Sequence, residues 1–159
     1  MKKEKKQQQH EHPSISETQQ VIFFIDRCLG RGIVPRALRA AGATVEIHDD
    51  HFSQNIRDED WLIEAGNRHW VVLTKDERIG YRTSQLLSIA QANVKVFVLA
   101  STNLSGDAIA LTFVNTLPQM TKFALNNPPP FIAKIYHPGR VTRWLNKTQI
   151  LRKIEPYTR

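Results

Sequence analysis

The feature that most constrains this chain is a short apolar run that ends in an acid. Residues 21–25 read Val-Ile-Phe-Phe-Ile, and Asp26 follows directly. Because every position is apolar, the run is typical of a strand buried on both faces, as in a parallel sheet. A second apolar run, residues 70–74, leads through a lysine to Asp76. Ligands of open α/β sheets bind outside the carboxyl ends of the strands, so both acids are candidate site residues. The plainer alternative is that each one caps a turn or the next helix.

Apolar runs and helical stripes alternate along the rest of the chain. Amphipathic stripes between and after the runs predict crossover helices, of which the last and longest starts after Ser105 and contains Pro118. This order predicts an α/β fold, a three-layer α/β/α sandwich around a five-stranded, mainly parallel sheet with right-handed crossovers. The five expected strands are residues 21–25, 44–48, 70–74, 94–99 and 131–136.

The ends of the chain differ from its middle in composition. Residues 1–20 are rich in Lys, Gln and His, and they hold too few apolar side chains to fold, so we expect a disordered tail. The folded domain is expected over residues 21–136, and residues 137–159 are expected to be a basic extension. No apolar run approaches the ~18–20 residues of a membrane helix, and no apolar segment follows the basic start as in a secretory signal. The sequence therefore predicts a soluble, cytoplasmic protein.

Charge is distributed unevenly. The net charge is +7; residues 26–107 carry ten basic and eleven acidic residues, whereas residues 108–159 carry eight basic residues and one acid. An acidic site beside a basic flank is suited to metal-assisted chemistry on a polyanion. The alternative is a solvated basic surface. The single cysteine, Cys28, excludes an internal disulfide and is expected to be a small packing residue rather than a nucleophile.

Polar residues follow several of the expected strands and begin one expected helix. Asp26, Asp76 and residues 101–103 would share the carboxyl edge of the sheet with the helix start at residues 58–60, Asp-Glu-Asp. Hard carboxylate oxygens select Mg²⁺ or Mn²⁺, which would relieve the repulsion between such acids. Acids in a first helical turn also arise from capping and the helix dipole alone. Residues 49–51, Asp-Asp-His, could be a further set of ligands, but a polar loop is the favoured interpretation.

The order of these motifs closely resembles the PIN-like nucleases, and most of all the compact VapC-type toxins of bacterial toxin–antitoxin systems. The resemblance rests on the strand ending at Asp26, the Asp-Glu-Asp-Trp-Leu helix start and the Val-Val-Leu-Thr-Lys-Asp-Glu-Arg run that contains Asp76. It implies a Mg²⁺-dependent endoribonuclease with an antitoxin partner, and it allows a homodimer. Asp26 and Asp76 would be the principal metal ligands and Asp58 the helix acid, with Asp60 or Glu59 as alternatives.

Further residues complete the predicted site. No acid ends the fourth strand, so Asn103 is the candidate for a weaker ligand there. Five basic residues are candidate RNA contacts, because they adjoin Asp76 or the fifth strand. They are Lys75, Arg78, Arg82, Arg140 and Arg143.

Two other classes of protein share parts of this pattern. A phospho-acceptor receiver domain would use Asp76, Ser101 or Thr102, and Lys134, but it requires an acidic pair after the first strand, where this chain has Asp26-Arg27. A PIN-like module that binds RNA or a protein without cutting is the other alternative. Divalent-dependent RNA cleavage would separate the nuclease from both.

Overall fold

A single mixed sheet organises the part of the chain described by the computed structural model, residues 20–158. Within that part the sheet has six strands in the order β2-β1-β3-β4-β5-β6, and all neighbours are parallel except β5 and β6. The strands are β1 (Ile22–Ile25), β2 (Thr44–Ile47), β3 (Val71–Thr74), β4 (Lys95–Leu99), β5 (Phe131–Tyr136) and β6 (Arg140–Leu145). Apart from Gln20, the tail predicted to be disordered lies outside the described residues.

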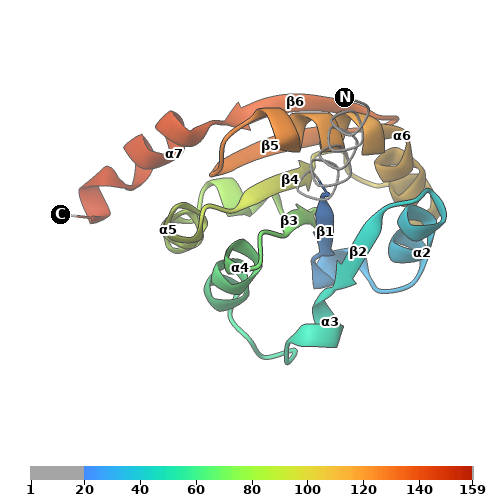
Figure 1. Ribbon diagram of the computed structural model, residues 1–159, viewed down its shortest axis with the longest axis horizontal. Helices are drawn as coiled ribbons and strands as arrows, with labels where there is room; N and C mark the ends of the chain where they lie inside the picture. Colours follow the sequence, from blue (N-terminus) through green and yellow to red (C-terminus); the bar gives the residue numbers. More distant parts are fainter. Residues whose placement is uncertain (1–19, 159) are drawn as a thin grey trace, which may run out of the picture.

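Helices cover both faces of the sheet, which confirms the predicted three-layer α/β/α architecture (Figure 1). On one face α2 packs against α6; on the other α5 packs against both α4 and α7. The helices are α2 (Ile33–Ala40), α3 (His48–His51), α4 (Asp58–Asn67), α5 (Thr83–Ala92), α6 (Gly106–Asn126) and α7 (Lys147–Ile154), with 3₁₀ turns η1 (Arg27–Leu29), η2 (Glu77–Gly80) and η3 (Glu155–Tyr157). Among the helices of residues 20–158, none combines the length and the hydropathy that crossing a membrane requires.

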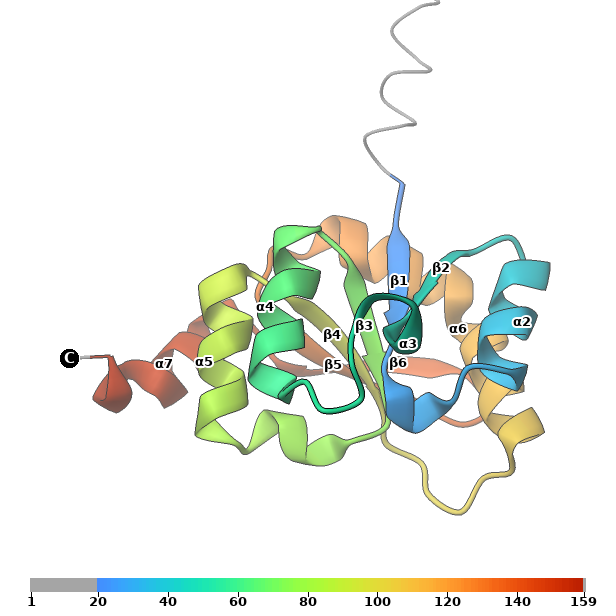
Figure 2. The same cartoon turned by 90° about the horizontal axis from the view of Figure 1, so that it is seen from below.

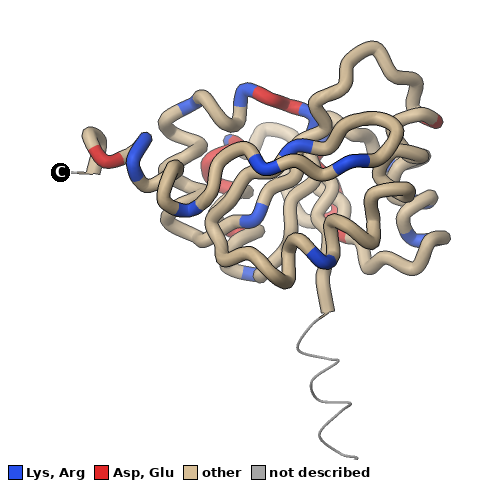
Figure 3. Tube along the Cα trace, turned by 90° about the horizontal axis from the view of Figure 1, so that it is seen from above, with Lys and Arg blue, Asp and Glu red and all other residues tan. Residues whose placement is uncertain are grey.

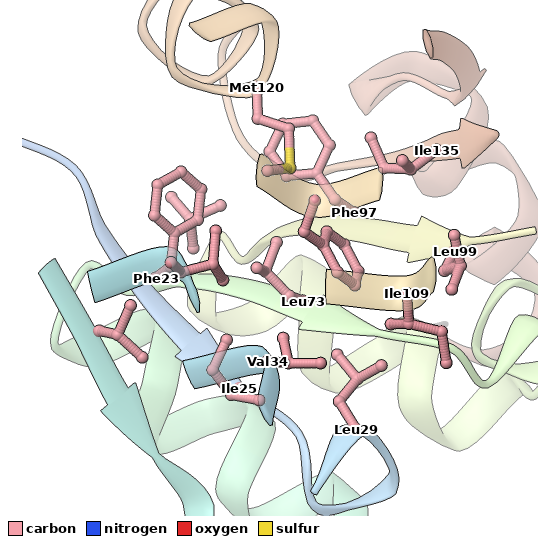
Figure 4. Close-up of a cluster of buried hydrophobic side chains, with 14 of the residues drawn as sticks. Phe23, Ile25, Leu29, Val34, Leu73, Phe97, Leu99, Ile109, Met120 and Ile135 are labelled. Atoms are coloured by element: carbon pink, nitrogen blue, oxygen red, sulfur yellow. The ribbon is translucent and has the colours of Figure 1, made fainter. Parts of the chain in front are cut away.

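The strands are apolar throughout because successive side chains enter different cores. Phe23 and Ile25 belong to the core under α2 and α6, whereas Phe24 between them belongs to the core under α4 and α5. Figure 4 shows the first of these cores, where strand side chains such as Phe97 meet Met120 of α6. Burying each such side chain stabilises the fold by about 1.5–3 kcal/mol. The expectation of strands buried on both faces is therefore confirmed.

The predicted count of five strands was one short. The segment expected to be a basic extension, residues 137–159, supplies β6, which pairs antiparallel with β5, and α7. The strand is hard to recognise in the sequence because its side chains are mostly exposed or half-buried, and two of them are arginines. Leu145, Ile150 and Ile154 are nevertheless buried in the core under α4 and α5. Half-buried edge strands of this kind lack the continuous apolar signal of central strands.

The parallel topology brings several strand ends to one edge of the sheet. Figure 2 shows the segments that follow β1 and β3 leaving at the same edge, close to the start of α4. The 3₁₀ turn η1 follows β1, and η2 follows β3. This edge is where the sequence places its candidate acids.

Candidate functional site

Three of the predicted acids lie around one opening at this edge. Asp26, Asp58 and Asp76 line a shallow pocket of about 280 Å³ together with Arg27 and Cys28. We call it the carboxylate pocket. The three acids come from the end of β1, the start of α4 and the end of β3, so the tertiary fold brings together residues that are far apart in the sequence.

Asp26 is held by groups on neighbouring elements. Its backbone N–H donates to the carbonyl oxygen of Leu73 at 3.0 Å, and its Oδ2 accepts hydrogen bonds from Thr74 Oγ1 at 2.8 Å and Cys28 Sγ at 3.4 Å. Burial raises the pKa of the Asp26 carboxyl, and the charge of Asp58 raises it further, against the lowering effect of these hydrogen bonds. Asp26 and Asp58 therefore lie close enough to repel each other.

Asp58 is fixed by two neutral donors. Its Oδ1 accepts a hydrogen bond from Trp61 Nε1 at 2.9 Å, and its Oδ2 accepts one from Gln85 Nε2 at 3.2 Å. Trp61 and Gln85 are both buried, so these donors are part of the packed interior of α4 and α5. Asp58 is the first residue of α4, and Arg57 occupies the cap position before it.

The two neighbouring acids of α4 are engaged elsewhere. Glu59 accepts a hydrogen bond from Ser84 Oγ at 2.6 Å, and this bond lowers the pKa of the Glu59 carboxyl. Asp60 is exposed and pairs with the guanidinium of Arg57 through two hydrogen bonds of 3.1 Å. Of the three acids at the helix start, Asp58 is the one that lines the carboxylate pocket.

Asp76 differs from the other two acids because arginines surround it. Its Oδ1 accepts hydrogen bonds from the backbone N–H and the Nε of Arg78, at 3.1 and 3.0 Å, and Arg82 Nη1 lies 3.7 Å from its Oδ2. Burial raises the pKa of Asp76, but the hydrogen bonds and charge of Arg78, with the charge of Arg82, outweigh it and hold that pKa below its usual value. Asp76 also caps η2, which carries Arg78.

The remaining predicted residues lie outside the carboxylate pocket. Asn103 and Lys75 line a separate pocket of about 210 Å³ beside the end of β4. Arg140 and Arg143 are exposed on β6, where the Arg140 guanidinium lies 5.0 Å from the ring centre of Tyr136. Figure 3 shows Lys and Arg positions spread singly along this side of the molecule rather than gathered at one point.

Sequence reasoning missed two residues that shape the pocket. Thr74 is buried at the end of β3, and its hydroxyl donates a hydrogen bond to Asp26. In the sequence, the hydroxyl residue at the end of an otherwise apolar run was the feature that could have identified Thr74 as part of the site. Cys28 was expected to be a packing residue, but it is exposed at the pocket while its Sγ lies 3.3 Å from Thr74 Oγ1. Desolvation and the charge of Asp26 raise the pKa of the Cys28 thiol to about 11, which keeps it protonated and poorly nucleophilic near neutral pH.

The chemistry of the donors in the pocket fits a hard divalent cation. Asp26 and Asp58 are carboxylates whose mutual repulsion a cation would relieve, and their hydrogen-bond donors fix them in place. Across residues 20–158, however, no three His, Cys, Asp or Glu side chains form a ready-made metal cluster. The Asp76 carboxylate pairs instead with Arg78, whose Nε lies 3.0 Å from Asp76 Oδ1.

The receiver-domain alternative would use Lys134 of β5 as the partner of Asp76, but the contacts of this lysine are with other residues. Lys134 Nζ lies 3.7 Å from Glu77 Oε2 and 4.2 Å from the ring centre of Trp144. It therefore belongs to the contact between η2 and β6 and does not line the carboxylate pocket.

Comparison with known proteins agrees with this geometry. The model of the PIN-like domain family matches residues 21–101, about half of the chain, and the matched segment contains all three acids of the carboxylate pocket. The chain therefore belongs to the PIN-like domain family, and the predicted membership is confirmed.

One relative extends the likeness beyond that segment. A protein of Mycobacterium tuberculosis (strain ATCC 25618 / H37Rv) named "Putative ribonuclease VapC45" is 25% identical over 127 residues, which cover 77% of this chain and 91% of the relative. The similarity to a VapC-type protein thus spans most of both chains. No solved structure matches the chain.

Proposed function

We propose that this protein is a divalent-metal-dependent endoribonuclease that acts as the toxin of a toxin–antitoxin pair. The observation that carries the proposal is the convergence of Asp26, Asp58 and Asp76 on one pocket at the carboxyl edge of the sheet. Membership of the PIN-like domain family and the ribonuclease name of the relative support it. The arginines beside Asp76 suit a substrate made of phosphodiesters.

The three pocket acids would hold the cation, with Asp26 and Asp58 as the pair whose charges are least compensated. When bound, Mg²⁺ or Mn²⁺ supplies Lewis-acid polarisation of the phosphodiester and a more acidic water. Thr74 and Cys28 orient the Asp26 carboxylate, while Trp61 and Gln85 orient Asp58. Fixed carboxylates of this kind reduce the reorganisation that binding and chemistry require.

The basic residues would bind the rest of the strand. Arg78 and Arg82 stand beside Asp76 with side chains 70% and 38% exposed, so their guanidinium groups are available to phosphates as well as to the carboxylate. Lys75 is exposed at the end of β3, and Arg140 and Arg143 add charge along β6. Arginine suits this task because its planar fork matches phosphate oxygens.

A cleavage assay tests the proposed activity. Purified protein is incubated with 5′-labelled single-stranded RNA in Mg²⁺, in Mn²⁺ and in excess EDTA, and the products are separated by length. Internal cleavage in either metal that EDTA abolishes and added metal restores is the expected result. Cleavage that persists in EDTA would contradict the metal-dependent mechanism, and intact RNA under all conditions would contradict the nuclease.

The toxin role has a separate test. The protein is co-expressed with the product of the adjacent reading frame, and the pair is purified through a tag on the partner. A stable complex that suppresses RNA cleavage is expected, because an antitoxin must neutralise the activity of its toxin. Light scattering on the free protein measures whether it is a homodimer. A partner that binds without suppressing cleavage would contradict the toxin role but not the nuclease.

A non-catalytic RNA-binding module is the second candidate, and the arginine pairing at Asp76 is the observation that favours it. Arg78 and Arg82 already neutralise that carboxylate, as a cation would in a nuclease. Titration calorimetry with Mn²⁺ separates the two functions. Binding that is lost in Asp26→Asn supports the metal site, whereas RNA binding without Mn²⁺ binding supports the module.

A further inference from the structure

Tyr81 is a large aromatic side chain that the proposed chemistry does not use. It is 67% exposed, and it directly follows η2, the turn that Asp76 caps. Single exposed aromatic residues are common on protein surfaces, so exposure alone implies nothing. The surroundings of Tyr81 make it different, because both its support and its charged neighbours are defined by contacts in the structure.

Tyr81 is supported by packed side chains. The ring packs edge-on against Trp144 of β6, with ring centres 5.4 Å apart. Trp144 also covers Gly80 so closely that a Cβ at Gly80 would lie 2.3 Å from the indole, and Lys134 Nζ lies 4.2 Å from the centre of the same indole. Ile79 is buried beneath the turn. The exposed ring is therefore backed by packed side chains, which lowers the entropy cost of holding a ligand on it.

The charged neighbours of Tyr81 point to a polyanion. Arg82 follows it, Arg78 precedes it by three residues, and both guanidinium groups contact Asp76 of the carboxylate pocket. An aromatic ring between cationic side chains is the usual arrangement for single-stranded nucleic acid, where rings stack on bases and cations bind phosphates. The 3₁₀ turn η2 separates Asp76 from Tyr81, and at about 2 Å per residue the backbone advances on the order of 10 Å between them. That span corresponds to about three stacked nucleotides at roughly 3.4 Å each.

We propose that Tyr81, backed by Trp144, is a stacking platform that holds one unpaired nucleobase beside the carboxylate pocket. The platform would fix which phosphodiester of a single strand enters the pocket. It would also favour unpaired RNA, because a base in a duplex cannot turn out to meet the ring. The inference rests on the proposed function for its substrate class, but its test measures binding and does not need cleavage.

The experiment is fluorescence anisotropy with a short single-stranded RNA in Ca²⁺, which slows turnover. Tyr81→Ala is expected to weaken binding by about 5- to 100-fold, the scale of one lost base stack, whereas Tyr81→Phe stays within about twofold of the unaltered protein. Tyr157→Ala is the matched control, since Tyr157 is 63% exposed on η3 and is not part of the pocket or of the platform. Equal affinities for Tyr81→Ala and Tyr157→Ala would overturn the proposal.

An abasic scan separates stacking from a structural role. Each nucleotide of the RNA is replaced in turn by an abasic one, and every oligonucleotide is titrated into the unaltered protein and into Tyr81→Ala. One or two positions should weaken binding to the unaltered protein, and the same positions should have no effect on Tyr81→Ala. If Tyr81→Ala weakens all oligonucleotides equally, including the abasic one at the sensitive position, the ring does not stack on a base and the proposal fails.

The remaining outcomes distinguish this inference from the proposed function. If the protein binds RNA with the Tyr81 dependence above but does not cut it in Mg²⁺ or Mn²⁺, the stacking platform is supported and the nuclease function is contradicted. If the protein cuts RNA and Tyr81→Ala binds RNA with unchanged affinity, the nuclease function is supported and the stacking platform is contradicted. If Tyr81→Ala abolishes capture of the adjacent gene's product while RNA binding is untouched, the surface serves a protein partner and the proposal is overturned.

Discussion

The carboxylate pocket and the β6 side of the molecule carry charge in opposite ways. In the pocket, neutral donors fix Asp26 and Asp58 close to each other, although their charges repel. The basic edge, which we define as β6 and α7, residues 140–154, holds five Lys and Arg and no Asp or Glu in its sequence. Its Arg140 and Arg143 side chains are exposed. The pocket thus contains acids that hydrogen bonds hold in place, whereas the basic edge is an exposed charged surface.

The contrast between hydrogen-bonded acids and exposed basic side chains indicates what each region can contribute to function. Groups held by hydrogen bonds within a fold can act at one atom of a substrate, because they are in place before the substrate binds. Exposed charges on flexible stems attract a polyanion and raise its association rate, but they do not place one phosphate. Substitutions in the pocket should therefore change turnover, and substitutions on the basic edge should change affinity and its dependence on salt.

The largest effect is expected for Asp26→Asn. Cleavage of RNA should fall by about 100-fold or more, because even a residue that only supports a metal ligand contributes 10- to 100-fold. RNA affinity in Ca²⁺ should hold, since the substitution removes a negative charge from the pocket. Initial rates under saturating RNA measure the effect. Full activity in Asp26→Asn would show that the pocket is not the catalytic site.

The next effect compares two acids of the same helix. Asp58→Asn should reduce the cleavage rate by about 10- to 100-fold, since Asp58 lines the pocket. Asp60→Asn should stay within roughly twofold, because its carboxylate is an exposed partner of Arg57. The two variants form a matched pair with the same chemical change two positions apart. Equal losses, or a larger loss for Asp60→Asn, would move the helix ligand to Asp60.

A smaller effect is expected on the basic edge. Replacing Arg140 and Arg143 together by Ala should flatten the slope of log affinity against log salt by roughly one to two units, because each phosphate contact to a single strand contributes about 0.7. The turnover rate at saturating RNA should not change. Anisotropy titrations across a salt series in Ca²⁺ measure the slope. An unchanged slope would mean that these arginines are solvated surface or serve the antitoxin instead.

The smallest effect concerns stability and pH. Folding raises the pKa of Asp26 above 3.8, so the folded protein binds its proton more tightly than the unfolded chain does. The ionised carboxylate therefore costs stability above the folded pKa, and this cost disappears as pH falls below 3.8. Asp26→Asn should raise the free energy of unfolding at pH 7 by on the order of 1 kcal/mol, with little difference below pH 3.8.

Urea denaturation at pH 7 and at pH 3.5 measures this difference, with Asp60→Asn as the control. The pKa of Asp60 is lowered by its hydrogen bond with Arg57, so the sign for Asp60→Asn is reversed and the variant loses stability at pH 7. A destabilised Asp26→Asn at neutral pH would contradict the view that burial, with the nearby charge of Asp58, raises the pKa of the Asp26 carboxyl.

The amino-acid sequence is sufficient to predict the central strands and the carboxyl edge of the sheet where Asp26 and Asp76 lie. Runs such as residues 21–25 can only be buried on both faces, and parallel strands joined by helices must end at one edge. Asp26 and Asp76 follow such runs, so their common location at that edge could be predicted without a structure. The local apolar pattern is sufficient here because it reflects burial, which acts on each strand separately.

Other features of the site and of the sheet can be assigned only from the tertiary structure. The resemblance named Asp58 as the helix acid but left Glu59 and Asp60 as alternatives. In the structure α4 packs against α5, and Gln85 donates a hydrogen bond to Asp58. The pairing of Arg78 with Asp76 is local, and it depends on the 3₁₀ turn η2, which contains Arg78 and is capped by Asp76. Strand β6 forms by pairing with the edge of β5, and the sequence of β6 has no apolar run that would predict a strand. The contact of Gln85 with Asp58 joins separate segments of the chain, and a one-dimensional pattern does not encode which of several similar side chains meets a given partner.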